Sequence, residues 1–346
     1  MSEVRNDGQN ILRVENLEMH FIQKKKHIRA VNNVSFSVRR GETFGFVGES
    51  GCGKSATCKA ILRLLPENGR IMGGKIFYCG ENLLDLSEKQ MRKVRGKEIG
   101  IVFQEPMTAL NPVLKIKEQM YEQFLDTSMT KEEKREKAIK MLRLVGIPSP
   151  ETRLNEYIHQ YSGGMRQRAM IALALAAEPR LLLADEPTTA LDVTIQAQII
   201  RLIESLKESL GMSIILITHD LGVVSEMCDR VAVMYAGTIV EMTDTKTLFA
   251  CPRHPYTEGL MQSLPKDSTR RGQLRAIQGM PPDLSGPGLG CSFCPRCKYA
   301  SGECAEMTPQ LREIAPNHWV SCHHAEQTEG TAGLIRLNDT EHKEGT

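Results

Sequence analysis

The chain contains 346 residues, of which 41% are hydrophobic and 25% charged, and its formal net charge is +2. This composition is typical of a globular protein of one or two domains, and the near-neutral charge argues against a broad surface for nucleic acid. No stretch approaches the roughly 20 uninterrupted apolar residues of a membrane span. The N-terminus lacks the apolar core of a secretory signal, so we expect a cytosolic chain.

Apolar patterns in the first 65 residues predict three strands followed by a helix. Residues 11–22 and 31–38 are typical of strands on either side of a basic turn, Lys24-Lys25-Lys26. Residues 43–47 form a short apolar run and predict a buried strand. Apolar residues at helical spacing over 56–65 predict a helix that stops at the next residue, a proline.

A glycine-rich loop joins this buried strand to the helix. Its residues are Gly48, Glu49, Ser50, Gly51, Cys52, Gly53, Lys54 and Ser55. Small residues let backbone N–H groups approach the β- and γ-phosphates of a nucleotide, and the following helix N-terminus favours negative charge. Lys54 would supply a positive charge, and the Ser55 hydroxyl would ligate Mg²⁺. Because strand, loop and helix occur in the order this motif requires, the sequence predicts binding of a nucleoside triphosphate, ATP, with Mg²⁺.

Further along the chain, strands alternate with helices. Strands are predicted at 69–78, 99–103, 181–186, 214–218, 231–235 and 238–242, and helical segments at 115–146 and from 193 to about 210. Alternation around a phosphate loop predicts an α/β domain with a largely parallel core sheet.

Polar side chains follow three of the predicted strands. Asp185 is expected to hold Mg²⁺ together with the loop hydroxyl, and Glu186 to act as a general base or to orient the attacking water. Taken alone, this acidic pair would equally fit a helix cap. His219 is placed to reach a γ-phosphate, although a lone histidine is more often structural. Gln104 follows the strand at 99–103 in the same way.

Ser162, Gly163 and Gly164 begin another apolar helix. Two glycines and a serine at a helix start build a second anion-binding N-terminus, although a simple helix cap is the alternative. Since the chain already has one phosphate site, the second would serve a nucleotide bound to another subunit.

Together these motifs resemble the ATP-binding subunits of ABC transporters, over about residues 11–263. The matching motifs are the Walker A loop, Q-loop Gln104, signature Tyr161-Ser162-Gly163-Gly164-Met165, Walker B Asp185 with Glu186, D-loop Asp192 and switch His219. The resemblance implies that Phe21 stacks on adenine, that Gln104 joins the Mg²⁺ ligands and that Glu186, His219 and Gln104 take part in hydrolysis. The signature departs from Leu-Ser-Gly-Gly-Gln at both ends, but every catalytic position is intact, so an active ATPase is expected.

A narrower resemblance is to the dipeptide/oligopeptide uptake group, which includes peptide, nickel and glutathione importers. It is carried by residues 103–112, by His254-Pro255-Tyr256-Thr257 and by the cysteine-rich C-terminus. It implies ATP-driven import of di- or oligopeptides, or of nickel, glutathione or another solute. It also implies a peripheral position at the cytoplasmic face of the inner membrane. The implied partners are a second, different ATPase subunit, two membrane permeases and an extracytoplasmic substrate-binding protein.

Two other functions are alternatives to import. A soluble ABC ATPase of DNA repair or translation generally carries two cassettes or nucleic-acid-binding insertions, and this chain has one cassette and near-neutral charge. An exporter subunit would lack the peptide-uptake features of the C-terminus.

The expected fold class is therefore α/β: an ABC-type P-loop ATPase core with an antiparallel β subdomain, an inserted helical subdomain and a Cys-rich C-terminal extension. The expected bounds are 8–263 for the ATPase domain, with the helical subdomain at about 105–165, and 264–326 for the extension. The polar segment 327–346 is expected to be a disordered tail.

Five of the ten cysteines lie between Cys291 and Cys322, and clustering of this kind in a cytosolic chain indicates a metal site. Separate reduced thiols are one alternative. Structural zinc is another, because Cys294 and Cys297 have Cys-x-x-Cys spacing, with His323 or His324 as further ligands. The resemblance to the uptake group instead implies a [4Fe–4S] cluster held by Cys291, Cys297, Cys304 and Cys322, with Cys294 outside the set.

Cys52 lies inside the phosphate loop and has two interpretations. One is a small filler residue with no reactivity. Alternatively, Lys54 and the helix N-terminus lower the pKa of its thiol and make it reactive toward maleimides.

Overall fold

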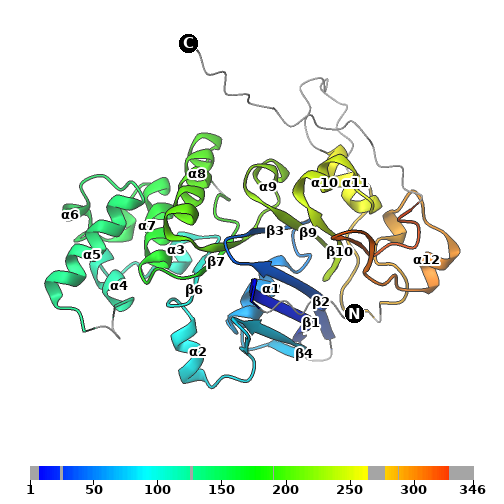
Figure 1. Ribbon diagram of the computed structural model, residues 1–346, viewed down its shortest axis with the longest axis horizontal. Coiled ribbons are helices and arrows are strands. Elements are labelled where there is room, and N and C mark those ends of the chain that lie inside the picture. The colour runs from blue at the N-terminus through cyan, green and yellow to red at the C-terminus, as the bar shows by residue number, and fades with distance from the viewer. Residues whose placement is uncertain are drawn as a thin grey trace, which may run out of the picture.

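A computed structural model describes residues 8–23, 26–124, 128–189, 191–263, 277–286 and 288–326. Two sheets and their flanking helices make up this part of the chain (Figure 1). The segment 327–346, expected to be a tail, lies outside the described residues, as do two of the three lysines of the basic turn. Within the described part, no helix is both long and apolar enough to cross a membrane.

The smaller sheet is antiparallel and has the strand order β2-β1-β4-β5. Its strands are β1 (Asn10–Gln23), β2 (Lys26–Arg39), β4 (Gly69–Tyr78) and β5 (Glu81–Asn82). The first three confirm the predicted strands, and β2 begins five residues earlier than expected because it pairs with β1 along its whole length.

The larger sheet has the order β11-β12-β10-β9-β3-β8-β7-β6. Its strands are β3 (Thr43–Val47), β6 (Ile99–Val102), β7 (Leu181–Asp185), β8 (Ser213–Ile217), β9 (Arg230–Tyr235), β10 (Thr238–Asp244), β11 (Arg312–Ala315) and β12 (His318–Val320). The run β9-β3-β8-β7-β6 is parallel, as the alternation of strands and helices predicted. Every residue of β3, β7 and β8 is buried, which is why these segments read as continuous apolar runs.

Helices follow the strands on both sides of this sheet (Figure 1). They are α1 (Lys54–Ile61), α2 (Glu88–Val94), α3 (Pro106–Ala109), α4 (Ile116–Glu122), α5 (Lys131–Leu144), α6 (Pro150–Arg153), α7 (Gly163–Leu175), α8 (Val193–Leu210), α9 (Leu221–Met227), α10 (Thr245–Ala250), α11 (Pro255–Gln262) and α12 (Gly302–Glu306). The described chain between β6 and β7 is helical, from α3 to α7. The long helical segment predicted at 115–146 is split into α4 and α5.

The first helix differs from its predicted range at both ends. It starts at Lys54, inside the phosphate loop, and ends at Ile61, four residues before the expected position. The reason for the early end is Arg63, whose backbone has a φ of 53°. Its guanidinium donates to the carbonyl oxygens of Leu83 and Leu86 at 3.3 and 2.6 Å, so tertiary hydrogen bonds outweigh local helix propensity.

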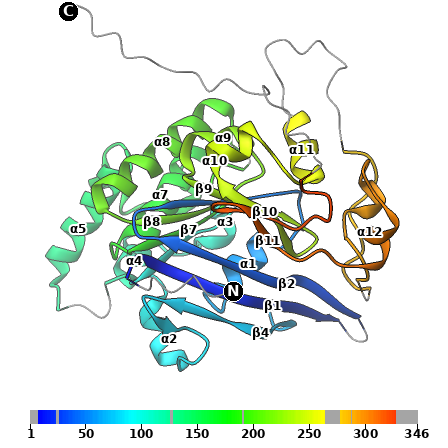
Figure 2. The same ribbon diagram turned by 45° about the vertical axis from the view of Figure 1, so that its right-hand side comes forward.

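The C-terminal part of the chain joins the core sheet by pairing β12 with β10 (Figure 2). Glu241, on β10, is fully buried. Its carboxylate accepts the backbone N–H groups of Arg253 and His254 at 2.7 and 2.9 Å, and lies 2.7 Å from the Nε2 atom of His318 on β12. One buried carboxylate thus connects the core sheet, the approach to α11 and the C-terminal strand.

This connection predicts a stability effect. Replacing Glu241 by Ala leaves two backbone N–H groups and one imidazole without an acceptor, and we expect a loss of about 3 kcal/mol in the free energy of unfolding. Glu241→Gln keeps one acceptor oxygen and should cost less. Urea unfolding at neutral pH measures the difference. The control is Glu226→Ala, at an exposed position, which should stay within about 0.5 kcal/mol of wild type. Equal midpoints for Glu241→Ala and the control would contradict the prediction.

Candidate active site

The phosphate loop depends on glycine at positions where another side chain would collide with backbone. Gly48 and Gly53 have φ values of 153° and 108°. A Cβ atom at Gly48 would meet the carbonyl oxygen of Met234, and one at Gly53 would meet that of Ala30. The loop therefore packs directly against β9 and β2, with no room for a larger residue.

Lys54 is buried and reaches back across the loop. Its ammonium donates to the backbone carbonyls of Gly48 at 2.7 Å and Glu49 at 3.0 Å. These bonds place the positive charge within the curve of the loop, as the motif predicts, and tie the conformation of the loop to the position of the lysine.

The hydroxyl of Ser55 donates to the Asp185 carboxylate at 2.7 Å. The two residues are 130 positions apart in sequence and meet because β3 and β7 both lie beside β8 in the parallel sheet. Burial raises the pKa of Asp185, and the Ser55 hydrogen bond partly opposes that shift. A hydroxyl and a carboxylate oxygen side by side are ligands that suit Mg²⁺.

Glu186 follows β7 with a backbone φ of 47°, a conformation that costs energy for a non-glycine residue and often marks functional positions. One oxygen of its carboxylate accepts the Gln104 amide at 3.0 Å and the Thr189 hydroxyl at 2.8 Å. The Nδ1 atom of His219 lies 3.6 Å from the same oxygen. The structure thus brings together the three predicted residues that follow β6, β7 and β8.

Neither Thr189 nor Gln167 was predicted from the sequence as a site residue. The side-chain amide of Gln167, on α7, donates to the carbonyl of Pro187, so the signature helix contacts the loop that carries Glu186. The only local signal for Thr189 is its position three residues after Glu186, within reach of a side-chain hydrogen bond. Gln167 carries no local signal, because its partner lies 20 residues away.

Ser162 and Asp192 both cap helices. The Ser162 hydroxyl accepts the N–H of Met165 at 3.4 Å at the start of α7, and the Asp192 carboxylate accepts that of Ile195 at 3.0 Å at the start of α8. Ser162, Gly163 and Asp192 are exposed. The capping alternative is therefore seen in the structure, and the accessible start of α7 also leaves a second anion site open.

Phe21 lies on β1, where it is opposite Ile28 on β2 and Gly69 on β4. It is half-buried and packs against the hydrophobic core of the smaller sheet. Its expected stacking on adenine stays a prediction.

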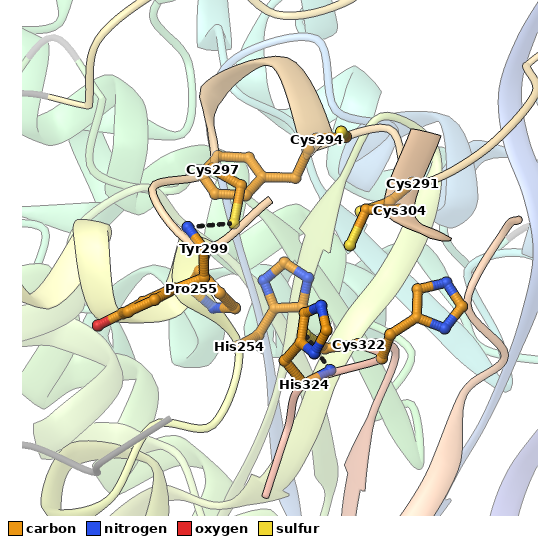
Figure 3. Close-up of a pocket in the computed structure, with 11 residues that line it drawn as sticks. His254, Pro255, Cys291, Cys294, Cys297, Tyr299, Cys304, Cys322 and His324 are labelled. Carbon is orange, nitrogen blue, oxygen red and sulfur yellow. Dashed lines mark hydrogen bonds between the residues drawn. The ribbon is translucent and has the colours of Figure 1, made fainter. Parts of the chain in front are cut away.

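Away from this site, five cysteines and three histidines line one small pocket (Figure 3). The lining includes Cys291, Cys294, Cys297, Cys304, Cys322, His254, His323 and His324. All five thiols are free. Burial, together with the neighbouring thiols of Cys291, Cys297 and Cys304, raises the pKa of Cys322 to about 11.

The histidines of this pocket have other partners. The Nε2 atom of His324 lies 2.9 Å from the Ser301 hydroxyl, and that of His323 lies 2.9 Å from the Met307 carbonyl. Within the part of the chain that the structure describes, no three Cys, His, Asp or Glu side chains are arranged to hold a metal ion.

A parallel sheet with a phosphate loop, an Asp-Glu pair and a second open helix start defines a P-loop ATPase of the ABC class. The ABC transporter family profile matches residues 31–189, and the profile described as the C-terminal region of oligopeptide/dipeptide transporters matches residues 240–304. The chain belongs to the ATP-binding proteins of ABC transporters, in the branch that carries this C-terminal region.

Curated relatives resemble it over most of their length. A probable peptide ABC transporter ATP-binding protein of Sinorhizobium fredii, y4tR, is 53% identical over 90% of this chain and 94% of its own. The oligopeptide transport ATP-binding protein OppD of Bacillus subtilis is 49% identical (90% and 87% covered). The dipeptide transport ATP-binding protein DppD of Escherichia coli is 44% identical (91% and 96% covered).

Among solved structures, the ATP-binding cassette MJ0796, described as dimeric and bound to ADP and Pi, aligns with a TM-score of 0.61. It is 28% identical over 68% of this chain and 98% of its own. The resemblance to ABC transporter subunits of the peptide-uptake group is thereby confirmed, and the chain is an ATPase of this family.

The hypothesis of a reactive Cys52 thiol is wrong in its physical basis. Burial raises the pKa of Cys52, and the charge and hydrogen bond of Lys54 oppose this shift without reversing it. Only 5% of the residue is exposed. Proximity to a lysine was visible in the sequence, whereas burial was not, and burial decides the direction.

We therefore predict that Cys52 reacts slowly with maleimide. Cys79 is exposed and should react faster, because burial raises the pKa of the Cys52 thiol and also restricts access of the reagent to it. Mass spectrometry of the full chain labelled at neutral pH measures both rates. Cys79→Ser should remove the fast phase and Cys52→Ala should leave it unchanged. Loss of the fast phase in Cys52→Ala would restore the original hypothesis.

Proposed function

We propose that this chain hydrolyses ATP to energise the import of di- or oligopeptides by an ABC transporter. The observation that carries the proposal is the match of residues 240–304 to the C-terminal region of oligopeptide/dipeptide transporters. Relatives named for peptide, oligopeptide and dipeptide transport, which align over about 90% of the chain, support the same substrate class.

The residues of the nucleotide site would have separate roles. Backbone N–H groups of the loop from Gly48 to Ser55 and the charge of Lys54 would bind the phosphates. Ser55 and Asp185, already in contact through a 2.7 Å hydrogen bond, would ligate Mg²⁺ with Gln104. Phe21 would stack on the adenine ring.

Glu186 would accept the proton of the attacking water. Its carboxylate is oriented by the Gln104 amide and the Thr189 hydroxyl, which leave its second oxygen free of these two bonds. His219 lies beside this group, and 63% of its side chain is exposed; it would contact the γ-phosphate.

A second subunit would complete the site. Ser162, Gly163, Gly164 and Asp192 lie at exposed or half-exposed helix starts, where they can meet the nucleotide held by another ATPase chain. We assign that partner to a second, different ATPase subunit. Two membrane permeases would dock at the segment after Gln104, and a substrate-binding protein outside the membrane would deliver the peptide. The chain would then be peripheral to the cytoplasmic face of the inner membrane.

The proposed domain division follows from the same assignment. Residues 8–263 form the ATPase domain, with an antiparallel β subdomain and a helical subdomain at about 105–165. Residues 264–326 form the Cys-rich extension, which reaches the core sheet through β12.

In this extension, Cys291, Cys297, Cys304 and Cys322 would hold a [4Fe–4S] cluster. The chemistry of the donor set supports this, because the four cysteines line one pocket and four thiolates are what such a cluster requires. Structural zinc is the alternative, because Cys294 and Cys297 have the Cys-x-x-Cys spacing that zinc sites use. When bound, the cluster would cross-link the extension and supply no redox step for transport.

The cluster predicts iron and sulfide in the purified protein. Anaerobically prepared chain should be brown, and Cys297→Ser should bleach it because one of the four thiolates is lost. The matched control is Cys294→Ser, in the same turn but outside the ligand set, which should keep its colour. Metal and sulfide analysis with visible absorption provides the measurement. Colourless protein with one equivalent of zinc would contradict the cluster and leave the nucleotide site unaffected.

The transport function predicts loss of peptide uptake when the general base is removed. Glu186→Gln should retain ATP binding, since the amide keeps the shape of the side chain, while ATP turnover falls by about 10²–10⁴-fold. Uptake of a labelled tripeptide by cells that carry only the variant should fall in parallel. Glu208→Gln, exposed on α8, is the control and should transport normally.

Two outcomes would contradict the assignments separately. ATP turnover of Glu186→Gln within about twofold of wild type would remove its role as the base. Normal peptide uptake in cells that lack the chain, with loss of nickel or glutathione uptake instead, would replace the proposed substrate.

A further inference from the structure

The Cys-rich extension contacts the phosphate loop directly. Arg296 lies in the short 3₁₀ turn Cys294–Arg296, and its guanidinium pairs with both carboxylate oxygens of Glu49, at 2.8 and 2.9 Å. The two residues are 247 positions apart in sequence. Only 4% of the Arg296 side chain is exposed, against 29% for Glu49. A two-pronged pair with a buried guanidinium and a partly exposed carboxylate has a specific geometry and is stronger than a fully exposed ion pair.

Arg296 is held in place by groups other than Glu49. It donates to the backbone carbonyls of Ile277 at 3.3 Å and Gln278 at 3.0 Å, and to the Tyr235 hydroxyl at 3.3 Å. These contacts satisfy donors of the guanidinium and fix its plane. The Arg296 side chain is therefore a rigid support for the loop that it touches.

The backbone of Glu49 has a second anchor. Its N–H donates to the Tyr256 hydroxyl at 2.8 Å. Tyr256, Tyr235 and Phe293 pack their rings together, with centroids 4.7 to 5.5 Å apart. Since Phe293 directly precedes the turn that carries Arg296, one aromatic cluster supports both contacts to Glu49.

Movement of Glu49 would also move Lys54. The carbonyl oxygen of Glu49 accepts the Lys54 ammonium at 3.0 Å, and this is the charge assigned to the phosphates. A chain of direct contacts thus runs from the Cys-rich extension through Arg296 and Glu49 to the group that binds nucleotide.

We propose that Arg296 is a positioning residue for ATP binding, which holds Glu49 so that the phosphate loop keeps the shape that receives the nucleotide. The extension is then part of the ATP site in function, although it contributes no group that touches ATP. The inference rests on the nucleotide site proposed above. It does not depend on the substrate transported or on what the cysteines bind.

The expected change in Kd depends on the fraction of molecules whose phosphate loop has the shape that binds nucleotide. If the Arg296–Glu49 pair keeps nearly all molecules in that shape and its loss leaves about one in ten, the apparent Kd for nucleotide rises about tenfold. Chemistry at saturating ATP should change little, because bound nucleotide restores the loop.

The test is a double-mutant cycle on the full chain. Arg296→Gln and Glu49→Gln should each raise the Kd for a non-hydrolysable ATP analogue with Mg²⁺ about tenfold, measured by calorimetry. The Kd of the double variant should not exceed that of the single variant with the higher Kd, since each substitution removes the same ion pair. In the assembled transporter, KM for ATP should rise in the same ratio and kcat should stay within about twofold.

The control is Arg312→Gln. Arg312 also makes a two-pronged pair with a glutamate, Glu326, within the extension, but that pair is exposed and away from the loop. Its Kd should equal that of wild type. Arg296→Lys keeps the charge and loses the planar fork, so a Kd between those of wild type and Arg296→Gln is expected. Should Arg296→Gln fail to fold, Glu49→Gln and Arg296→Lys still decide the question.

Other outcomes would overturn the proposal. A lower thermal midpoint for Arg296→Gln with an unchanged Kd would make the pair purely structural. Additive effects of the two single substitutions would show that the residues do not act through each other. Lys54→Ala separates this failure from failure of the site itself: normal analogue binding by Lys54→Ala would refute the nucleotide site, whatever Arg296 does.

Discussion

The parallel pairing of β3, β8, β7 and β6 is the constraint on which the site depends. Parallel strands end at the same edge of a sheet, so residues that follow separate strands meet there although they are far apart in sequence. This arrangement brings Ser55 and Asp185 together in a 2.7 Å hydrogen bond. The contacts of Glu186 with Gln104 and His219 have the same origin. β3, β7 and β8 are fully buried, and the polar residues that follow the strands converge at one edge.

Two carboxylates connect distant segments to this sheet and to the phosphate loop. Glu241 connects β10, the approach to α11 and β12. Glu49 connects the phosphate loop to Arg296 and, through its backbone, to Tyr256. The fully buried charge of Glu241 is compensated by donors from two other segments, whereas the partly exposed Glu49 carboxylate is paired with the Arg296 guanidinium. The C-terminal extension is therefore joined to the ATPase core at two separate points, one in the sheet and one in the loop.

Local sequence signals predicted the elements of the core well and some of their ends poorly. The strand at 43–47 has its predicted bounds because it is a short apolar run between turn residues. The end of α1 was misplaced because Arg63 takes a left-handed conformation and hydrogen bonds to Leu83 and Leu86. Nothing near Arg63 in the sequence indicates those partners. The same holds for Gln167 and its contact with Pro187.

The sequence by itself determined the class of protein, because the phosphate loop, the Asp-Glu pair and the Ser-Gly-Gly helix start are each contiguous and occur in one order. It also predicted which polar residues follow the strands, since an apolar run and the polar residue after it are adjacent in the chain. Tertiary structure decided the remainder. Burial reversed the expected pKa shift of Cys52, and the Arg296–Glu49 pair links positions 247 residues apart. Desolvation and long-range pairing depend on what surrounds a residue in space, and a linear pattern carries no measure of either.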